Sequence, residues 1–214
     1  MLHAELVALH SVTVATRTDT AASRERFLRL TLAGAGTLTL GGALAAGVPR
    51  GGLSGTSPAR DVEILNYALT LEELQAAFYA RAVNGGALSG ELREFAEVVA
   101  AHEREHVELL RGALGAQARP APRFAFGKAA TSAPRFAETA SELEELAVAA
   151  YNGQAANLSK EALQAAARIV SVDARHAAWI RAIRGRPPAS QATDEAKTRR
   201  QVLVQIDRTG FVRS

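Results

Sequence analysis

The sequence contains no cysteine, one methionine and one tryptophan, and only 5% of its residues are aromatic. A chain without cysteine forms no disulfide and offers no thiolate to a metal ion. Long runs of β-branched or aromatic residues, which favour strands, are scarce, whereas alanine, the best helix former, is abundant. We therefore expect an all-α protein, and a composition that is 48% apolar and 22% charged suits a globular domain.

Long runs of like charge are also missing. The 25 basic and 22 acidic residues are interspersed and leave a net charge of +3. Nucleic-acid-binding arms concentrate lysine and arginine in one segment, so nucleic acid is not an expected partner.

Residues 1–49 are predicted to form an N-terminal leader that resembles an export signal. Arg24, Arg26 and Arg29 precede the uncharged stretch LTLAGAGTLTLGGALAAGVP at residues 30–49. Basic residues followed by an apolar segment with small residues at its end are typical of a cleaved signal, and an uncleaved membrane anchor is the alternative. SRERFLRL at residues 23–30 is similar to the twin-arginine signal, with Glu25 in the place of the second arginine. We expect export to the periplasm, cell envelope or extracellular space, with membrane contact only through this segment.

The rest of the chain divides into three parts. A linker is expected at residues 50–60, a four-helix bundle at 61–186 and a C-terminal tail at 187–214. The helices are predicted at about 61–83, 91–114, 138–158 and 160–184. Prolines at 120, 122 and 134 predict a long crossing connection over 116–137, and residues 201–206 of the tail are expected to dock as a short helix.

The apolar face of each predicted helix is interrupted by acids. The first and third helices each carry one inward acid, and the second and fourth each carry an acid followed three residues later by histidine, which lies on the same helical face. The two halves repeat with an offset of 72 residues for the first acid and 70 for the second. The residues of this pattern are Glu72, Glu103, His106, Glu144, Asp173 and His176. Glu73 and Glu145 adjoin the single acids, and the helical pattern favours Glu72 and Glu144 as the inward residues.

Four carboxylates in a bundle core would be costly to bury unless they were protonated, paired or bound to cations. Two divalent cations would balance their charge, and each histidine would add one neutral nitrogen per ion. Oxygen-rich donor sets with one imidazole per metal suit iron or manganese better than structural zinc. We therefore expect two iron or manganese ions, and no organic cofactor is evident.

Four stretches carry a resemblance to a known family: ILNYALTLEELQAAFY, HEREHVELLRGAL, ELEELAVAAYNGQA and VSVDARHAAWIRAI. They resemble the ferritin-like di-iron and di-manganese carboxylate proteins, and most of all an exported bacterial branch related to desiccation-associated proteins. The resemblance implies a four-helix bundle with a long crossover between the second and third helices. It also implies that Glu72 and Glu144 bind terminally, that Glu103 and Asp173 bridge, and that His106 and His176 complete the ions.

The resemblance implies a reaction of metal ions with oxygen or peroxide. This reaction would be either oxidation of the metal or detoxification of peroxide or oxygen. Asp173 stands where the family more often has glutamate, and Gln75 where the branch often has a second acid. These departures motivate the alternative of a non-catalytic envelope or stress protein with a degenerate site. Iron storage in a hollow homo-oligomer is a third interpretation.

Three nearby side chains receive simpler interpretations from the sequence. His102 is interpreted as an exposed or core-satisfied neighbour of the site. Tyr79 and Tyr151 lie seven residues beyond Glu72 and Glu144, and core packing is favoured for both over electron transfer or hydrogen bonding to groups that surround the ligands.

Overall fold

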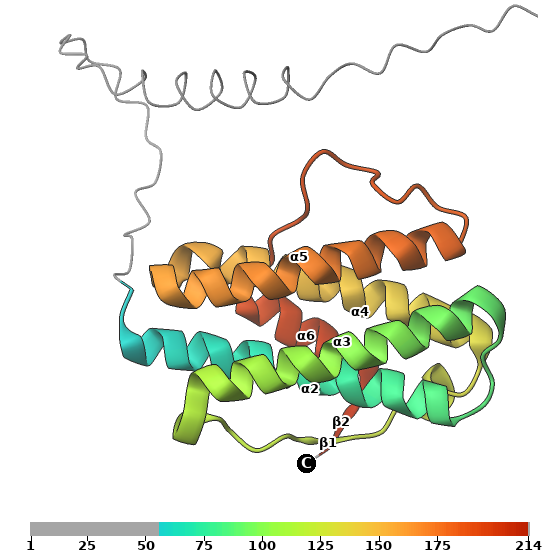
Figure 1. Ribbon diagram of the computed structural model, residues 1–214, viewed down its shortest axis with the longest axis horizontal. Helices are drawn as coiled ribbons and strands as arrows, with labels where there is room; N and C mark the ends of the chain where they lie inside the picture. Colours follow the sequence, from blue (N-terminus) through green and yellow to red (C-terminus); the bar gives the residue numbers. More distant parts are fainter. Residues whose placement is uncertain (1–55, 214) are drawn as a thin grey trace, which may run out of the picture. The chain divides into compact units, whose positions relative to one another are not determined.

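Four long helices make up most of the structure (Figure 1). The computed structural model describes residues 56–213. Its long helices are α2 (Pro58–Asn84), α3 (Gly90–Leu114), α4 (Ala133–Gln154) and α5 (Lys160–Ile183). Helix α2 packs mainly on α3, and α4 mainly on α5, so each half of the bundle is a helical hairpin. The predictions of an all-α fold and of a four-helix bundle are confirmed.

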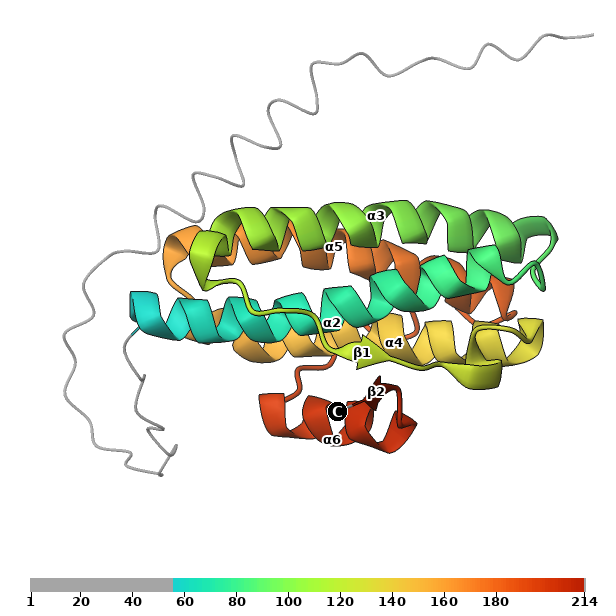
Figure 2. The same cartoon turned by 90° about the horizontal axis from the view of Figure 1, so that it is seen from below.

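The connection between α3 and α4 runs alongside α2 for much of the length of the bundle, as predicted (Figure 2). It contains two short 3-10 turns, Gly115–Gln117 and Gly127–Ala129, and strand β1 (Arg123–Phe124). Strand β1 pairs antiparallel with β2 (Val212–Arg213) near the C-terminus, with Phe124 opposite Val212. The sequence does not predict this sheet, because two-residue strands have no detectable periodicity.

Two helices begin earlier than the sequence predicts. Helix α2 begins at Pro58, within the predicted linker, and the side chain of Ser57 accepts a hydrogen bond from the backbone of Arg60. Helix α4 begins at Ala133, five residues before the expected start, so the placement of Pro134 outside the helix is wrong. Proline is tolerated in the first turn, where its missing N–H would have no helical partner. Helix α4 also ends earlier, at Gln154, and a 3-10 turn at Ala155–Asn157 leads to α5.

The apolar core consists of two clusters at different levels of the bundle. Along α3, Phe95 and Val99 belong to one cluster, and Leu110 and Leu114 belong to the other. Phe78 packs at the centre of the first cluster, stacked on Phe136 at a centroid distance of 5.3 Å. The segment of α3 between the two clusters carries Glu103 and His106, so the polar residues of the pattern lie between two apolar layers.

The C-terminal tail forms a fifth described helix, α6 (Arg199–Thr209), which includes the segment expected to dock. Thr198 and Gln201 form a reciprocal capping box at its start. Val202 and Ile206 are buried in the first apolar cluster, so α6 covers one side of the bundle (Figure 2).

The predicted leader, residues 1–49, and most of the predicted linker lie outside the described residues. Within residues 56–213, no helix combines the length and the apolar character that crossing a membrane requires.

The chain leading to α6 approaches α4 closely at Gly153. The backbone N–H of Lys197 donates to the carbonyl of Ala149 at 2.9 Å. A Cβ atom added at Gly153 would lie 1.8 Å from the carbonyl oxygen of Lys197. Only glycine therefore allows this contact.

We expect Gly153→Ala to displace the segment that holds α6 and to lower the free energy of unfolding by about 1–3 kcal/mol. Urea unfolding and limited proteolysis of residues 187–198 would measure the two effects. Gly112→Ala is the matched control, because Gly112 lies in α3 with nothing within 4 Å of an added Cβ. Equal stability of the Gly153→Ala and Gly112→Ala variants would contradict this assignment.

Candidate metal centre

The six residues of the sequence pattern come together in the bundle core. Helices α2 and α4 supply Glu72 and Glu144, and α3 and α5 supply the acid-and-histidine pairs. All four carboxylate residues are 0% exposed, and both histidines are buried. They form two groups, in each of which the donor atoms lie within 4.8 Å of one another. The groups are Glu72, Glu103, His106 and Asp173, and Glu103, Glu144, Asp173 and His176.

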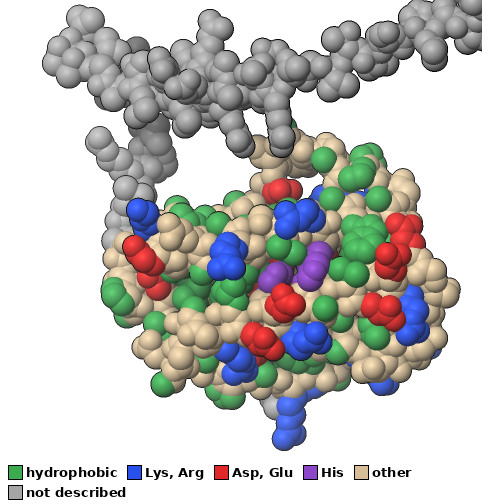
Figure 3. All heavy atoms as spheres, in the orientation of Figure 1, with side chains coloured by type: hydrophobic (Ala, Val, Ile, Leu, Met, Phe, Trp, Pro, Cys, Tyr) green, Lys and Arg blue, Asp and Glu red, His purple; other side chains and the backbone are tan. Residues whose placement is uncertain are grey.

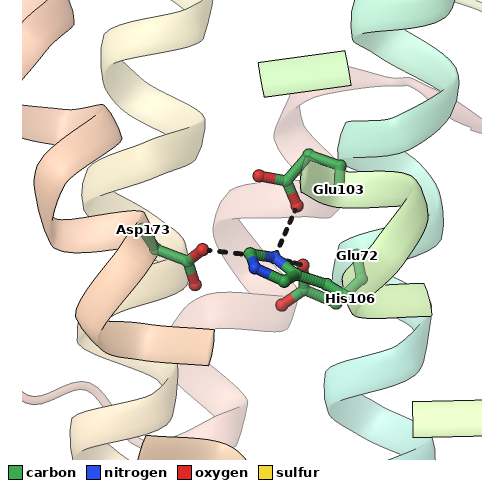
Figure 4. Close-up of side chains that lie close together, drawn as sticks. All are labelled: Glu72, Glu103, His106 and Asp173. Carbon is green, nitrogen blue, oxygen red and sulfur yellow. Dashed lines mark hydrogen bonds and ion pairs between the residues drawn. The ribbon is translucent and has the colours of Figure 1, made fainter. Parts of the chain in front are cut away.

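The first group surrounds the imidazole of His106 (Figure 4). Its Nδ1 lies 3.2 Å from Oε2 of Glu72 and 3.4 Å from Oε2 of Glu103. Oδ1 of Asp173, which reaches across from α5, lies 3.5 Å from the same nitrogen. Three carboxylate oxygens and one nitrogen from three helices therefore converge here.

The second group surrounds His176 in the same manner. Its Nδ1 lies 3.2 Å from Oε1 of Glu103, 3.3 Å from Oε2 of Glu144 and 4.0 Å from Oδ1 of Asp173. Glu103 thus presents one carboxylate oxygen to each histidine, and Oδ1 of Asp173 faces both. These two carboxylates are common to both groups.

Glu72 and Glu144 each belong to only one of the two groups and are called here the unshared glutamates. A tyrosine hydroxyl donates a hydrogen bond to one carboxylate oxygen of each. The hydroxyl of Tyr151 donates to Oε1 of Glu72 at 2.7 Å, and that of Tyr79 donates to Oε1 of Glu144 at 2.5 Å. Nε2 of Gln75 donates to the same oxygen of Glu144 at 3.0 Å. The sequence favoured core packing for the tyrosines, and the structure shows that they also orient the carboxylates. In the sequence, the sign of this role is that each tyrosine lies seven residues beyond a glutamate of the pattern on its own helix, and therefore on the same helical face.

The neighbouring acids turn away from the site. Glu73 forms an ion pair with Arg111 of α3, and Glu145 pairs with Arg181 of α5 at 3.0 Å. The side chain of Glu145 is 44% exposed. The structure therefore places Glu72 and Glu144 inward, as the helical pattern favoured.

His102 lies beside the site but in neither group. Its Nδ1 lies 2.9 Å from Nε2 of His176, on the side of that ring away from the carboxylates. His102 is half-buried, and burial, together with the charges of His176 and His106, lowers its pKa and favours the neutral ring. Histidine side chains reach the surface of the face on which α3 and α5 lie (Figure 3).

Burial and mutual repulsion govern the ionisation of the shared carboxylates. Burial, with the charges of Glu72 and Glu144, raises the pKa of Glu103 well above its ordinary value. Burial and the charges of Glu72 and Glu103 likewise raise the pKa of Asp173. Burial also opposes ionisation of Glu72, but the hydrogen bond with His106 and the other contacts of the carboxylate outweigh it and lower the pKa of Glu72. Burial opposes protonation of His106, but its hydrogen bond to Glu72 raises the pKa of His106 overall.

Most of the site's inward atoms have no hydrogen-bond partner. Among the described residues, the buried side-chain atoms without a partner include both carboxylate oxygens of Glu103 and of Asp173, Oε2 of Glu144 and Nδ1 of His176. Buried polar atoms are rarely left unsatisfied in native proteins. Buried oxygen and imidazole donors that face one another and have no hydrogen-bond partner fit a metal cation, which would satisfy them and offset their charge.

Comparison with known proteins agrees with the fold. A family model described as a ferritin-like domain matches residues 60–186. This range contains all four long helices except the first two residues of α2, together with all six clustered residues. A search among curated proteins finds no match to the chain.

We expect Glu103→Gln to stabilise the metal-free protein. Because the pKa of Glu103 is higher in the folded than in the unfolded chain, the wild type loses stability as pH rises above 4.5, the ordinary value, toward the raised pKa. The neutral amide removes this loss, and each tenfold rise in proton affinity corresponds to about 1.4 kcal/mol. Chemical unfolding of chelator-treated protein at several pH values would measure the difference, which should increase with pH.

Glu108→Gln is the control, because Glu108 is exposed on the same helix. A Glu103→Gln protein that is less stable than wild type at pH 8 in chelator would show that the carboxylate is not under electrostatic strain.

Proposed function

Because the chain belongs to the ferritin-like domain family, we propose that it binds two iron or manganese ions in its core and oxidises metal or consumes oxygen or peroxide with them. The observation that carries the proposal is the pair of donor groups that share Glu103 and Asp173. Two ions that share carboxylates lie close together, which is the arrangement of dinuclear sites.

The donors divide evenly between two ions. Glu72 and His106 would hold one ion, and Glu144 and His176 the other, with Glu103 and Asp173 common to both. When all four carboxylates are ionised their charge is −4, which two divalent ions would balance. Asp173 is shorter than glutamate, but its Oδ1 lies within 4.0 Å of Nδ1 of both histidines, which supports its shared role.

The chemistry that bound iron or manganese supplies is one-electron oxidation and reduction next to an open coordination position. The residues of this chain hold the donors in place and limit solvent access. Tyr79 and Tyr151 fasten one oxygen of each unshared glutamate, so that the other oxygen faces the histidines. Apolar layers at both levels of the bundle keep water from the carboxylates.

A route by which small molecules would approach the site leads to its two histidines. A groove of about 350 Å³ between α3 and α5 has both His106 and His176 in its lining. Its volume would admit oxygen, peroxide or a metal ion, and these are the reactants that the proposal requires.

Export of the protein is a separate proposal that depends on the sequence of residues 23–50 alone. Cell fractionation and N-terminal sequencing of the mature protein would test it. Recovery of the intact chain, from Met1, in the cytosol would contradict it.

Metal analysis of protein purified without chelator tests the proposed site directly. We expect about two iron or manganese ions per chain in the wild type and at least a tenfold loss of metal affinity in Glu72→Gln and Glu144→Gln, because each variant removes a charged donor. Plasma mass spectrometry gives the metal content. Consumption of oxygen or peroxide by the loaded protein then tests the activity.

The matched controls are Glu73→Gln and Glu145→Gln, which alter the adjacent acids that face away from the site. Both should retain the metal. Folded wild-type protein that binds neither Fe²⁺ nor Mn²⁺ would contradict the proposal and leave a non-catalytic bundle as the better interpretation.

A further inference from the structure

The two halves of the site differ in what holds their donors. Nε2 of His176 has a partner in His102, at 2.9 Å from its Nδ1. Within residues 56–213, no side chain hydrogen-bonds Nε2 of His106, which borders the groove. The two halves of the sequence are related by an offset of 70 residues, which places Val172 at the position equivalent to His102. The side chain of Val172 cannot form a hydrogen bond.

A second asymmetry concerns the unshared glutamates. Oε1 of Glu144 accepts hydrogen bonds from both Tyr79 and Gln75, at 2.5 and 3.0 Å. Oε1 of Glu72 accepts one, from Tyr151 at 2.7 Å. The offset of 72 residues pairs Gln75 with Ala147, so the first half has no counterpart of this amide.

The contact with His102 selects the form of His176 that binds a cation. Nδ1 of His176 faces the oxygens of Glu103 and Glu144, and it must be free of a proton to bind a metal. When Nδ1 binds a metal, the neutral ring of His176 carries its proton on Nε2 and donates a hydrogen bond to Nδ1 of His102. This hydrogen bond fixes both the tautomer and the orientation of the ring, as partners of metal-bound histidines generally do.

We propose that His102 is a positioning residue and that, with Gln75, it makes the half of the site around Glu144 and His176 the tighter of two unequal metal positions. The inference depends on the proposed dinuclear site. Pre-oriented donors lose less conformational freedom when they bind, so the first ion to enter occupies this half.

Calorimetric titration of the metal-free, full-length protein with Mn²⁺ tests the inference without any measurement of activity. Wild type should bind two ions in resolved steps. His102→Ala should weaken the tighter step about 10- to 100-fold and leave the other step within about threefold. His106→Ala should keep the tight step, and His176→Ala should lose it, which assigns each step to its half.

Two further variants separate positioning from a general effect on structure. His102→Asn keeps an oxygen that can accept the proton on Nε2 of His176, and it should restore most of the affinity. Val172→Ala alters the corresponding position of the other half and should change neither step. Thermal unfolding of each metal-free variant checks that the fold is retained. If His102→Ala fails to fold, the test depends on His102→Asn, and loss of its tighter step, or equal weakening of both steps, would overturn the inference.

Two steps of equal affinity in the wild type, or equal weakening of both steps in His102→Ala, would overturn the inference while leaving the dinuclear site intact. Absence of any Mn²⁺ or Fe²⁺ binding to the wild type would instead overturn the proposed function. The two failures are therefore distinguishable.

Discussion

The burial of four carboxylates in one bundle core is the constraint on which the rest of the structure depends. Glu72, Glu103, Glu144 and Asp173 are 0% exposed, and Glu103 and Asp173 have no hydrogen-bond partner for any of their oxygens. Such groups destabilise a fold unless they are protonated or neutralised by a cation. The apolar layers above and below the site must therefore contribute enough stability to hold the four helices together around it, and a bound cation would then add to that stability.

The two tyrosines connect this constraint to the packing of the helices. Tyr79 lies on α2 and donates to Glu144 on α4, whereas Tyr151 lies on α4 and donates to Glu72 on α2. Each helix thus orients the carboxylate of the other, across the interface between the two halves. A shift of α2 along α4 would break both hydrogen bonds at once, so the register of the bundle and the geometry of the donors depend on each other.

Much of this arrangement could be predicted because it follows from periodicity within single helices. An acid on an apolar face, as at Glu72, or an acid three residues before a histidine, as at Glu103, identifies an inward-facing polar group without knowledge of its neighbours. Contacts between helices could not be predicted in this way. The sequence gives no reason for His102 to meet His176 rather than solvent, or for Lys197 to approach Gly153. Helix starts also depend on a capping residue and on tolerance of proline in the first turn, which placed Pro134 inside α4.

The charge of the donor set, rather than the fold, limits which cations the site can bind. A bundle of this family accommodates many donor sets, so the four helices alone do not specify a reaction. Here the donor set has four carboxylates and two imidazoles, and two divalent ions would balance four ionised carboxylates. Gln75 keeps that balance, because its amide donates a hydrogen bond to Glu144 where a carboxylate would have added a fifth negative charge to an apolar core. An amide at this position therefore leaves four carboxylates in the donor set, and its hydrogen bond orients one of them.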